Sequence, residues 1–125
     1  MISKIHSTTI VVSDQAKALD FYENTLGWKR SIDNPMGPEM RFLTVAPADG
    51  ATELVLGLAS WAGESSTMGG NTGISLITND IDAEYQTLTG RGVTFKGPVE
   101  VMPWGDKAAW FSDPDGNEFF LVEGK

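Results

Sequence analysis

The sequence predicts an α+β protein in which one βαβββ unit occurs twice in tandem. Two β-branched stretches, residues 8–14 and 73–80, each end in Asp and precede a segment with apolar residues at helical spacing. Strand-like segments follow both helices, and Pro-Ala-Asp-Gly at 47–50 matches Pro-Asp-Gly at 114–116. Each sheet then has one face for its helix and one face left over. We therefore expect two mixed sheets that curl together around a cavity.

The first unit is expected over residues 1–58. Its first strand covers residues 8–14, and Asp14 can cap a helix over 15–26, where the apolar side chains recur at helical spacing. Gly27 is expected to end this helix, because glycine favours the left-handed conformation found after helix C-termini. The remaining strands are expected at about 29–32, 40–46 and 52–58.

The second unit, residues 73–125, repeats this plan. Asp80 or Asp82 is expected to start its helix, which ends near residues 90–92. An Asp-Pro-Asp-Gly turn at 113–116 joins the last two strands, since proline presets φ and glycine accepts a positive φ. The strands are expected at about 93–96, 107–111 and 118–123.

The segment 59–72, between the two units, is rich in Gly and Ser. One interpretation is a flexible linker. The other is a flap over a pocket, because Trp61 and Met68 lie inside an otherwise polar stretch. We treat the whole chain, residues 1–125, as a single domain made of the two units and this segment.

Length, composition and charge narrow the classes of function. The 125 residues suffice for one domain with its own core, and the absence of cysteine is compatible with a reducing, cytoplasmic setting. We expect neither a signal peptide nor a membrane span, because the chain starts directly with a strand-like run and no apolar stretch is long enough. The net charge of −8 argues against nucleic acid as a partner. It is explained by solubility or by a preference for cationic ligands.

Four segments, in this order, resemble the vicinal oxygen chelate superfamily, which includes glyoxalase I, extradiol dioxygenases, fosfomycin-resistance enzymes and bleomycin-resistance proteins. The segments are Val12-Ser13-Asp14 with Ala18-Leu19-Asp20-Phe21-Tyr22, Glu53-Leu54-Val55-Leu56, Thr78-Asn79-Asp80-Ile81-Asp82 and Asp113-Pro114-Asp115-Gly116-Asn117. Pro103-Trp104-Gly105 also resembles a turn of bleomycin-resistance-like members. The resemblance implies the glyoxalase/bleomycin-resistance fold and a homodimer.

In metal-dependent members of this superfamily, four strand positions hold one divalent ion with His and Glu side chains. The resemblance places these positions at Ser7, Glu53, Gly73 and Phe120. Only Glu53 is a strong ligand, so we expect no metal cofactor; a divalent metal remains the alternative. His6 lies one residue from the first position, on the opposite strand face unless a bulge or a shifted register moves it.

If these four positions face the cavity, residues two apart from them face it too. The cavity set is then Ser7, Thr9, Val11, Glu53, Val55, Ser75, Ile77, Phe120 and Val122. The residues of opposite parity are apolar and are expected to pack against the helices: Ile10, Val12, Leu54, Leu56, Ile74, Leu76, Phe119 and Leu121. A mixed cavity set of this kind suits an organic ligand better than an ion.

Four tryptophans offer further stacking surfaces. Trp61 and Trp104 lie in loop-like segments and are expected at the pocket rim, whereas Trp28 and Trp110 fit core packing equally well. A buried Glu53 needs a partner, which is Arg41 unless Arg41 is simply a solvated strand residue. The residues expected to bind a ligand are Ser7, Thr9, Arg41, Glu53, Val55, Trp61, Ser75, Trp104, Trp110 and Phe120.

Two functions of different classes fit these observations. The first is a metal-independent binding protein without catalytic residues that sequesters an aromatic or cationic natural product, as bleomycin-resistance proteins do. The second is an enzyme of this superfamily, a lyase, isomerase or dioxygenase, with an atypical metal site or with Glu53 as its catalytic group. No Ser/His or Cys/His arrangement for nucleophilic catalysis is evident. A regulatory subunit with a metabolite ligand is a further alternative. The expected partners are therefore a small organic ligand and a second copy of the chain, without nucleic acid or membrane.

Overall fold

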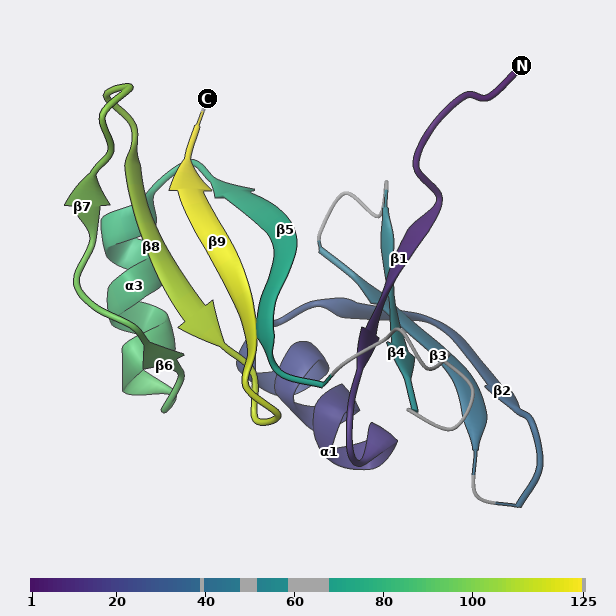
Figure 1. Cartoon of the computed structure of the whole chain (residues 1–125). Helices are drawn as coiled ribbons and strands as arrows, with labels where there is room; N and C mark the ends of the chain where they lie inside the picture. Colours follow the sequence, from purple (N-terminus) through teal and green to yellow (C-terminus); the bar gives the residue numbers. More distant parts are fainter. Residues whose placement is uncertain (39, 48–51, 59–67, 125) are drawn as a thin grey trace. The chain divides into compact units, whose positions relative to one another are not determined.

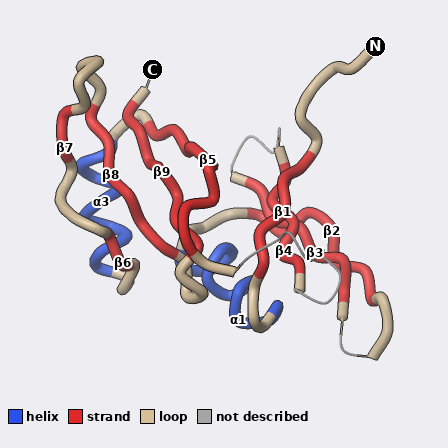
Figure 2. The backbone as a smooth tube through the Cα atoms, viewed as in Figure 1, coloured by secondary structure: helices blue, strands red, loops and turns tan. Residues whose placement is uncertain are grey.

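A computed structural model describes residues 1–38, 40–47, 52–58 and 68–124. The chain divides into two compact units, Met1–Met68 and Gly69–Lys125. Each unit contains one mixed sheet and a helix, and neither sheet closes into a barrel (Figure 1). Figure 2 shows the strands of each unit in red and the helices in blue. The predicted α+β class is thereby confirmed.

The first unit follows the predicted order of elements. These are β1 (Ser7–Val11), α1 (Gln15–Asp20), the π-helical turn η1 (Phe21–Thr25), β2 (Lys29–Pro35), β3 (Arg41–Ala46) and β4 (Glu53–Gly57). The sheet order is β1-β4-β3-β2, and β1 runs parallel to β4. Asp14 caps α1 as predicted, since its Oδ1 accepts hydrogen bonds from the amides of Ala16 (2.9 Å) and Lys17 (3.1 Å). The π-helical turn was not predicted.

The second unit repeats the plan with one additional short strand. Its elements are β5 (Gly70–Thr78), α3 (Ile81–Gly90), β6 (Thr94–Phe95), β7 (Glu100–Val101), β8 (Lys107–Ser112) and β9 (Asn117–Glu123). The sheet order is β5-β9-β8-β6, β7 also pairs with β8, and β5 runs parallel to β9. Asp80 is the helix cap, because its side chain accepts from the amide of Ala83 at 3.1 Å. β7 was not predicted, and β5 begins inside the segment 59–72.

The predicted hairpin between β8 and β9 is confirmed, and Asp113 organises its turn. This buried carboxylate accepts hydrogen bonds from the amides of Asp115 (3.0 Å) and Asn117 (2.8 Å) and from Asn117 Nδ2 (2.9 Å). Asn117 Oδ1 in turn accepts from the amide of Gly69 at 2.9 Å. The turn therefore also fixes the start of β5.

Much of the core lies on the helix-facing side of each sheet. In the first unit, Ile10, Val12, Leu54 and Leu56 are buried as predicted. In the second unit, rings run from α3 across three strands: Tyr85–Phe95 (4.6 Å between centroids), Phe95–Phe111 (5.7 Å) and Phe111–Phe119 (5.5 Å). Leu121 is buried, whereas Ile74 and Leu76 are half-buried. Among the described helices, none has the length and apolar character that a bilayer crossing requires.

Candidate functional site

The strand register places the predicted cavity residues on one face of each sheet. In the first unit Ser7 pairs with Glu53 across the parallel strands, and in the second unit Ser75 pairs with Phe120. Directly paired residues project to the same face. Thr9 with Val55 and Ile77 with Val122 continue the two rows. The register thus shows that these residues share one face within each unit, while the expectation that this face lines a ligand cavity stays a prediction.

Gly73 departs from the expected arrangement. The β5–β9 register shifts between Asn71 and Ser75, so Gly73 lies in an irregularity with a φ of 74°. Thr72 fills part of this bulge by donating its hydroxyl hydrogen to the carbonyl of Glu118 at 2.7 Å. Ser75, and not Gly73, is therefore the neighbour of Phe120 on β5.

Glu53 is held by hydroxyl groups. Its Oε1 accepts a hydrogen bond from Thr44 Oγ1 at 2.7 Å, and the Ser31 hydroxyl also donates to its carboxylate. The Thr44 bond is the largest cause of a lowered Glu53 pKa. Partial burial opposes this shift, whereas Ser31 and the positive charges of His6 and Lys4 add to it. Glu53 is consequently a carboxylate at neutral pH.

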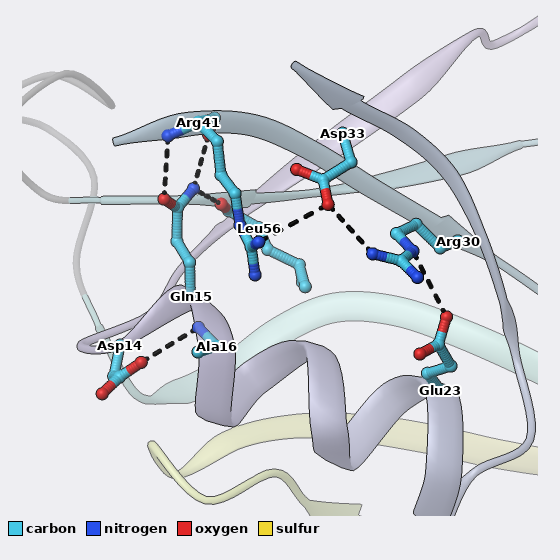
Figure 3. Close-up of polar contacts among 8 residues, drawn as sticks. All are labelled: Asp14, Gln15, Ala16, Glu23, Arg30, Asp33, Arg41 and Leu56. Carbon is cyan, nitrogen blue, oxygen red and sulfur yellow. Dashed lines mark hydrogen bonds and ion pairs between the residues drawn. The ribbon is translucent and has the colours of Figure 1, made fainter. Parts of the chain in front are cut away.

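Arg41 does not pair with Glu53, so the prediction of that ion pair was wrong. Side chains alternate along β3. Arg41 and Leu43 therefore lie on the helix-facing side, and Thr44 lies on the same side as Glu53. The Arg41 guanidinium lies 3.5 Å from Asp33 Oδ2 (Figure 3). The error arose because the sequence does not show which parity of β3 faces the helix. Thr44 supplies the partner instead.

A pocket of about 640 Å³ lies beside Arg41 on the helix-facing side of the first unit. Its lining residues are Ser13, Asp14, Gln15, Ala16, Asp33, Pro35, Gly37, Pro38, Met40, Arg41 and Leu58. The polar groups there bond mainly to one another. Asp33 binds both Arg30 (3.0 Å) and Arg41, and Arg30 also contacts Glu23 at 3.4 Å (Figure 3).

Gln15 fixes the start of α1 beside this pocket. Its Oε1 accepts from the amide of Arg41 (3.1 Å), and its Nε2 donates to the carbonyls of Arg41 (2.7 Å) and Leu56 (2.8 Å) (Figure 3). The side chain is buried, with 7% exposure for the whole residue. Gln15 therefore binds the helix to two strands, a structural role that leaves its polar atoms bonded within the protein.

The second unit carries an aromatic platform, which we define as Trp104, Trp110 and Phe120. The Phe120 ring lies 4.8 Å from Trp110 and 6.4 Å from Trp104, measured between ring centroids. Trp110 and Phe120 are a cross-strand pair, and Trp104 stands in the turn between β7 and β8 with 62% exposure. Ile77, on the same sheet face, is 71% exposed. This face of the sheet offers large apolar surface to a ligand.

The other two tryptophans differ from this pair. Trp28 packs against the buried Tyr22 ring at a centroid distance of 5.4 Å, which favours the core interpretation for Trp28. Trp61 lies outside the described residues, as do positions 59–67 of the expected linker or flap. Trp110 joins the platform and is half-buried, so it combines packing with an accessible edge.

The residues present do not fit the metal site of metal-dependent members. Ser7 and Glu53 are neighbours as that site requires, but Gly73 offers no donor and Phe120 presents a ring. Across the part of the chain that the structure describes, no three His, Cys, Asp or Glu side chains gather around a common point. His6 precedes β1 and is exposed, and its carbonyl accepts from the amide of Glu53 at 3.0 Å.

Sequence reasoning missed Thr44 and Ser31. The signal for Thr44 was available, because it is the one polar residue in the buried run Leu43-Thr44-Val45-Ala46. A hydroxyl at such a position needs a hydrogen-bond partner. Ser31 gave no such signal, because its contact with Glu53 depends on an irregularity in β2 pairing.

Two βαβββ units, each pairing its first and last strands in parallel, define the architecture of the vicinal oxygen chelate proteins. The chain belongs to the Glyoxalase/Bleomycin resistance protein/Dioxygenase superfamily, whose family model matches residues 4–121. Protein YetH of Bacillus subtilis (strain 168), described as uncharacterized, is 36% identical over 123 residues, covering 98% of this chain and 100% of that protein.

Two solved structures are similar over nearly the full length. A superfamily member from Sphaerobacter thermophilus DSM 20745 has a TM-score of 0.92 and 61% identity, with 98% of each chain covered. TnmS3, described as an antibiotic binding protein from Streptomyces sp. CB03234, has a TM-score of 0.85 and 40% identity, covering 99% of this chain and 98% of its own.

Proposed function

We propose that this protein binds and sequesters a flat aromatic or cationic natural product without a metal cofactor and without catalysis. The observation that carries the proposal is the aromatic platform. Three rings on an accessible sheet face can stack on a planar ligand, and they also attract a cation through their π-faces. The similarity to TnmS3, described as an antibiotic binding protein, supports a small organic ligand.

The state of Glu53 supports binding in preference to catalysis. A general acid or base works best with a pKa near the operating pH, which for a carboxyl group requires an upward shift. The pKa of Glu53 is shifted downward by its hydroxyl donors. Glu53 is therefore suited to accept hydrogen bonds from a ligand amine or hydroxyl group. We further propose that the protein is cytoplasmic and forms a homodimer. Sedimentation equilibrium would test the dimer, and cell fractionation would test the location.

Binding is tested by isothermal titration with two flat dyes of opposite charge, proflavine (cationic) and anthraquinone-2-sulfonate (anionic). Wild-type protein should bind proflavine with the higher affinity. Trp104→Ala should lower the affinity for both dyes by about 5- to 10-fold, because it removes one stacking contact worth roughly 1 kcal/mol. Val101→Ala shortens an exposed apolar side chain outside the platform, and it should change the affinity for neither dye. Equal effects of the two variants would refute the platform as the binding surface.

Metal independence is tested separately. Native protein should contain less than about a tenth of an equivalent of Ni, Zn, Mn or Fe by elemental mass spectrometry, and soaking in these ions should not raise the content, because a site needs several good ligands. A content near one equivalent that falls on Glu53→Ala would restore the enzyme alternative.

A further inference from the structure

The polar contacts around Glu53 depend on a bulge in β2. The β2–β3 register shifts between Arg30, which pairs with Val45, and Ile32, which pairs with Thr44. Ser31 is thus an extra residue with no partner in the ladder. Such bulges redirect a side chain and are frequent beside functional sites. Here the Ser31 hydroxyl reaches the Glu53 carboxylate on β4, with β3 between the two strands.

Thr44 forms hydrogen bonds with both the bulge and Glu53. Its Oγ1 accepts from the amide of Ile32 at 3.0 Å and donates to Glu53 Oε1 at 2.7 Å. A hydroxyl has one hydrogen to donate, so the incoming bond from Ile32 leaves the Thr44 hydrogen available for Glu53. Thr44 has no solvent exposure, which makes this orientation costly to change.

Thr44 also has a structural role, because its hydroxyl oxygen accepts from the amide of Ile32 at the bulge. That role uses only the oxygen and does not require the hydroxyl hydrogen to be donated to Glu53. Glu53 is the first residue of β4 and only half-buried, so an uncharged side chain could stand there too. The bulge, Thr44 and Ser31 converge on one carboxylate, and both donors are neutral.

We propose that Thr44 and Ser31 are positioning residues that hold the Glu53 carboxylate in one orientation to receive an N–H-bearing cation, such as an amidinium or a primary ammonium. The choice of ligand class rests on the proposed function. Both side-chain donors are uncharged, and within the described residues no cation forms an ion pair with Glu53 to neutralise its charge. The charged groups that act on it are Lys4 and His6, both exposed and both ahead of β1.

The positioning role is tested first without ligand. The ¹³C shift of the Glu53 side-chain carboxyl is followed against pH in wild-type protein, Thr44→Ser, Thr44→Val and Ser31→Ala. The titration midpoint of Glu53 in wild-type protein should lie below the ordinary value for glutamate. Thr44→Ser should leave this midpoint unchanged, and Thr44→Val should raise it. Ser31→Ala should give a smaller upward change. Lys4 and His6 are present in every variant, so their influence is common to all. A Thr44→Val midpoint equal to that of wild type would overturn the role.

The ligand class is tested with benzamidine and its neutral isostere benzamide, by amide chemical-shift titration. Wild-type protein and Thr44→Ser should prefer benzamidine by at least fivefold, and Thr44→Val should lose that preference. Glu53→Gln should lose it as well. If wild-type protein showed no preference, the cation class would be overturned, while the apo titration would still decide the role of Thr44. The two failures are thus distinguishable.

Discussion

At the residue scale, the ionisation of Glu53 makes the stability of the fold depend on pH. Its pKa is lowered in the folded protein, chiefly by Thr44, so its ionised form stabilises the fold. For a lowered carboxyl pKa, this stabilisation is complete above the unfolded value of about 4.3 and is lost as the pH falls through the folded value.

We therefore predict that the stability difference between wild-type protein and Glu53→Gln is constant near neutral pH and shrinks toward acid. Urea unfolding followed by circular dichroism at a series of pH values measures this difference. The same series on Asp106→Asn, an exposed acid in the turn before β8, supplies the baseline. A difference that stayed unchanged below pH of about 3 would show that Glu53 is not linked to folding.

The residue scale also shows where sequence reasoning succeeded and where it stopped. Parity along a strand correctly predicted that Thr9 shares a sheet face with Ser7, and Val55 with Glu53, because alternation is fixed by backbone geometry. Arg41 was paired with the wrong acid, because charge complementarity alone ignores which side of the sheet a residue occupies. The partner of Glu53 came from β3, through a bulge that no local pattern announces.

At the element scale, each helix begins at an aspartate that ends the preceding strand region. Asp14 satisfies two amides of the short helix α1, which continues into a π-helical turn. We predict that Asp14→Ala lowers the free energy of unfolding by about 1 kcal/mol, whereas Asp14→Asn, which keeps a capping oxygen, costs a few tenths. Chemical denaturation of the two variants measures this. An equal loss in both would point to charge and not to capping.

The turn between β8 and β9 is the second element with a testable role. Asp113 accepts three hydrogen bonds while 5% exposed, so removing it leaves buried donors without partners. We predict a loss of about 2–4 kcal/mol for Asp113→Ala, since each buried unsatisfied group is costly. Asp106→Ala, in the exposed turn before β8, should cost less than about 0.5 kcal/mol. Thermal and urea unfolding would contradict the prediction if both variants behaved alike.

The long elements were predictable, and so was the short strand β6, expected at about 93–96, whereas the short strand β7 was not. The helices and main strands carry capping residues, periodic apolar positions and turn sequences that agree with one another. The two-residue strands β6 and β7 exist because β8 offers them an edge, and β7 has no pattern of its own. The register shift in β5 is likewise a tertiary effect, in which Thr72 bonds the carbonyl of Glu118.

At the scale of the whole molecule, the net charge of −8 acts on every ligand that approaches. A field of this sign draws cations toward the surface and repels anions, and salt screens both effects over about 10 Å at 0.1 M ionic strength. We predict that the association rate of proflavine falls as NaCl is raised, while that of anthraquinone-2-sulfonate rises. Stopped-flow fluorescence measures both rates. Parallel salt responses of the two dyes would exclude steering by the protein's charge.

The parallel pairing of first and last strands in each unit has a consequence for biosynthesis. β1 leaves the ribosome with no partner until β4 is made, and β5 waits in the same way for β9. Each half therefore commits to its structure only when its final strand arrives, and the earlier half can do so while the later half is still being translated. A chain that ends before Asn117 leaves the edge of β5 unpaired, which makes such a truncation product prone to aggregate through that edge.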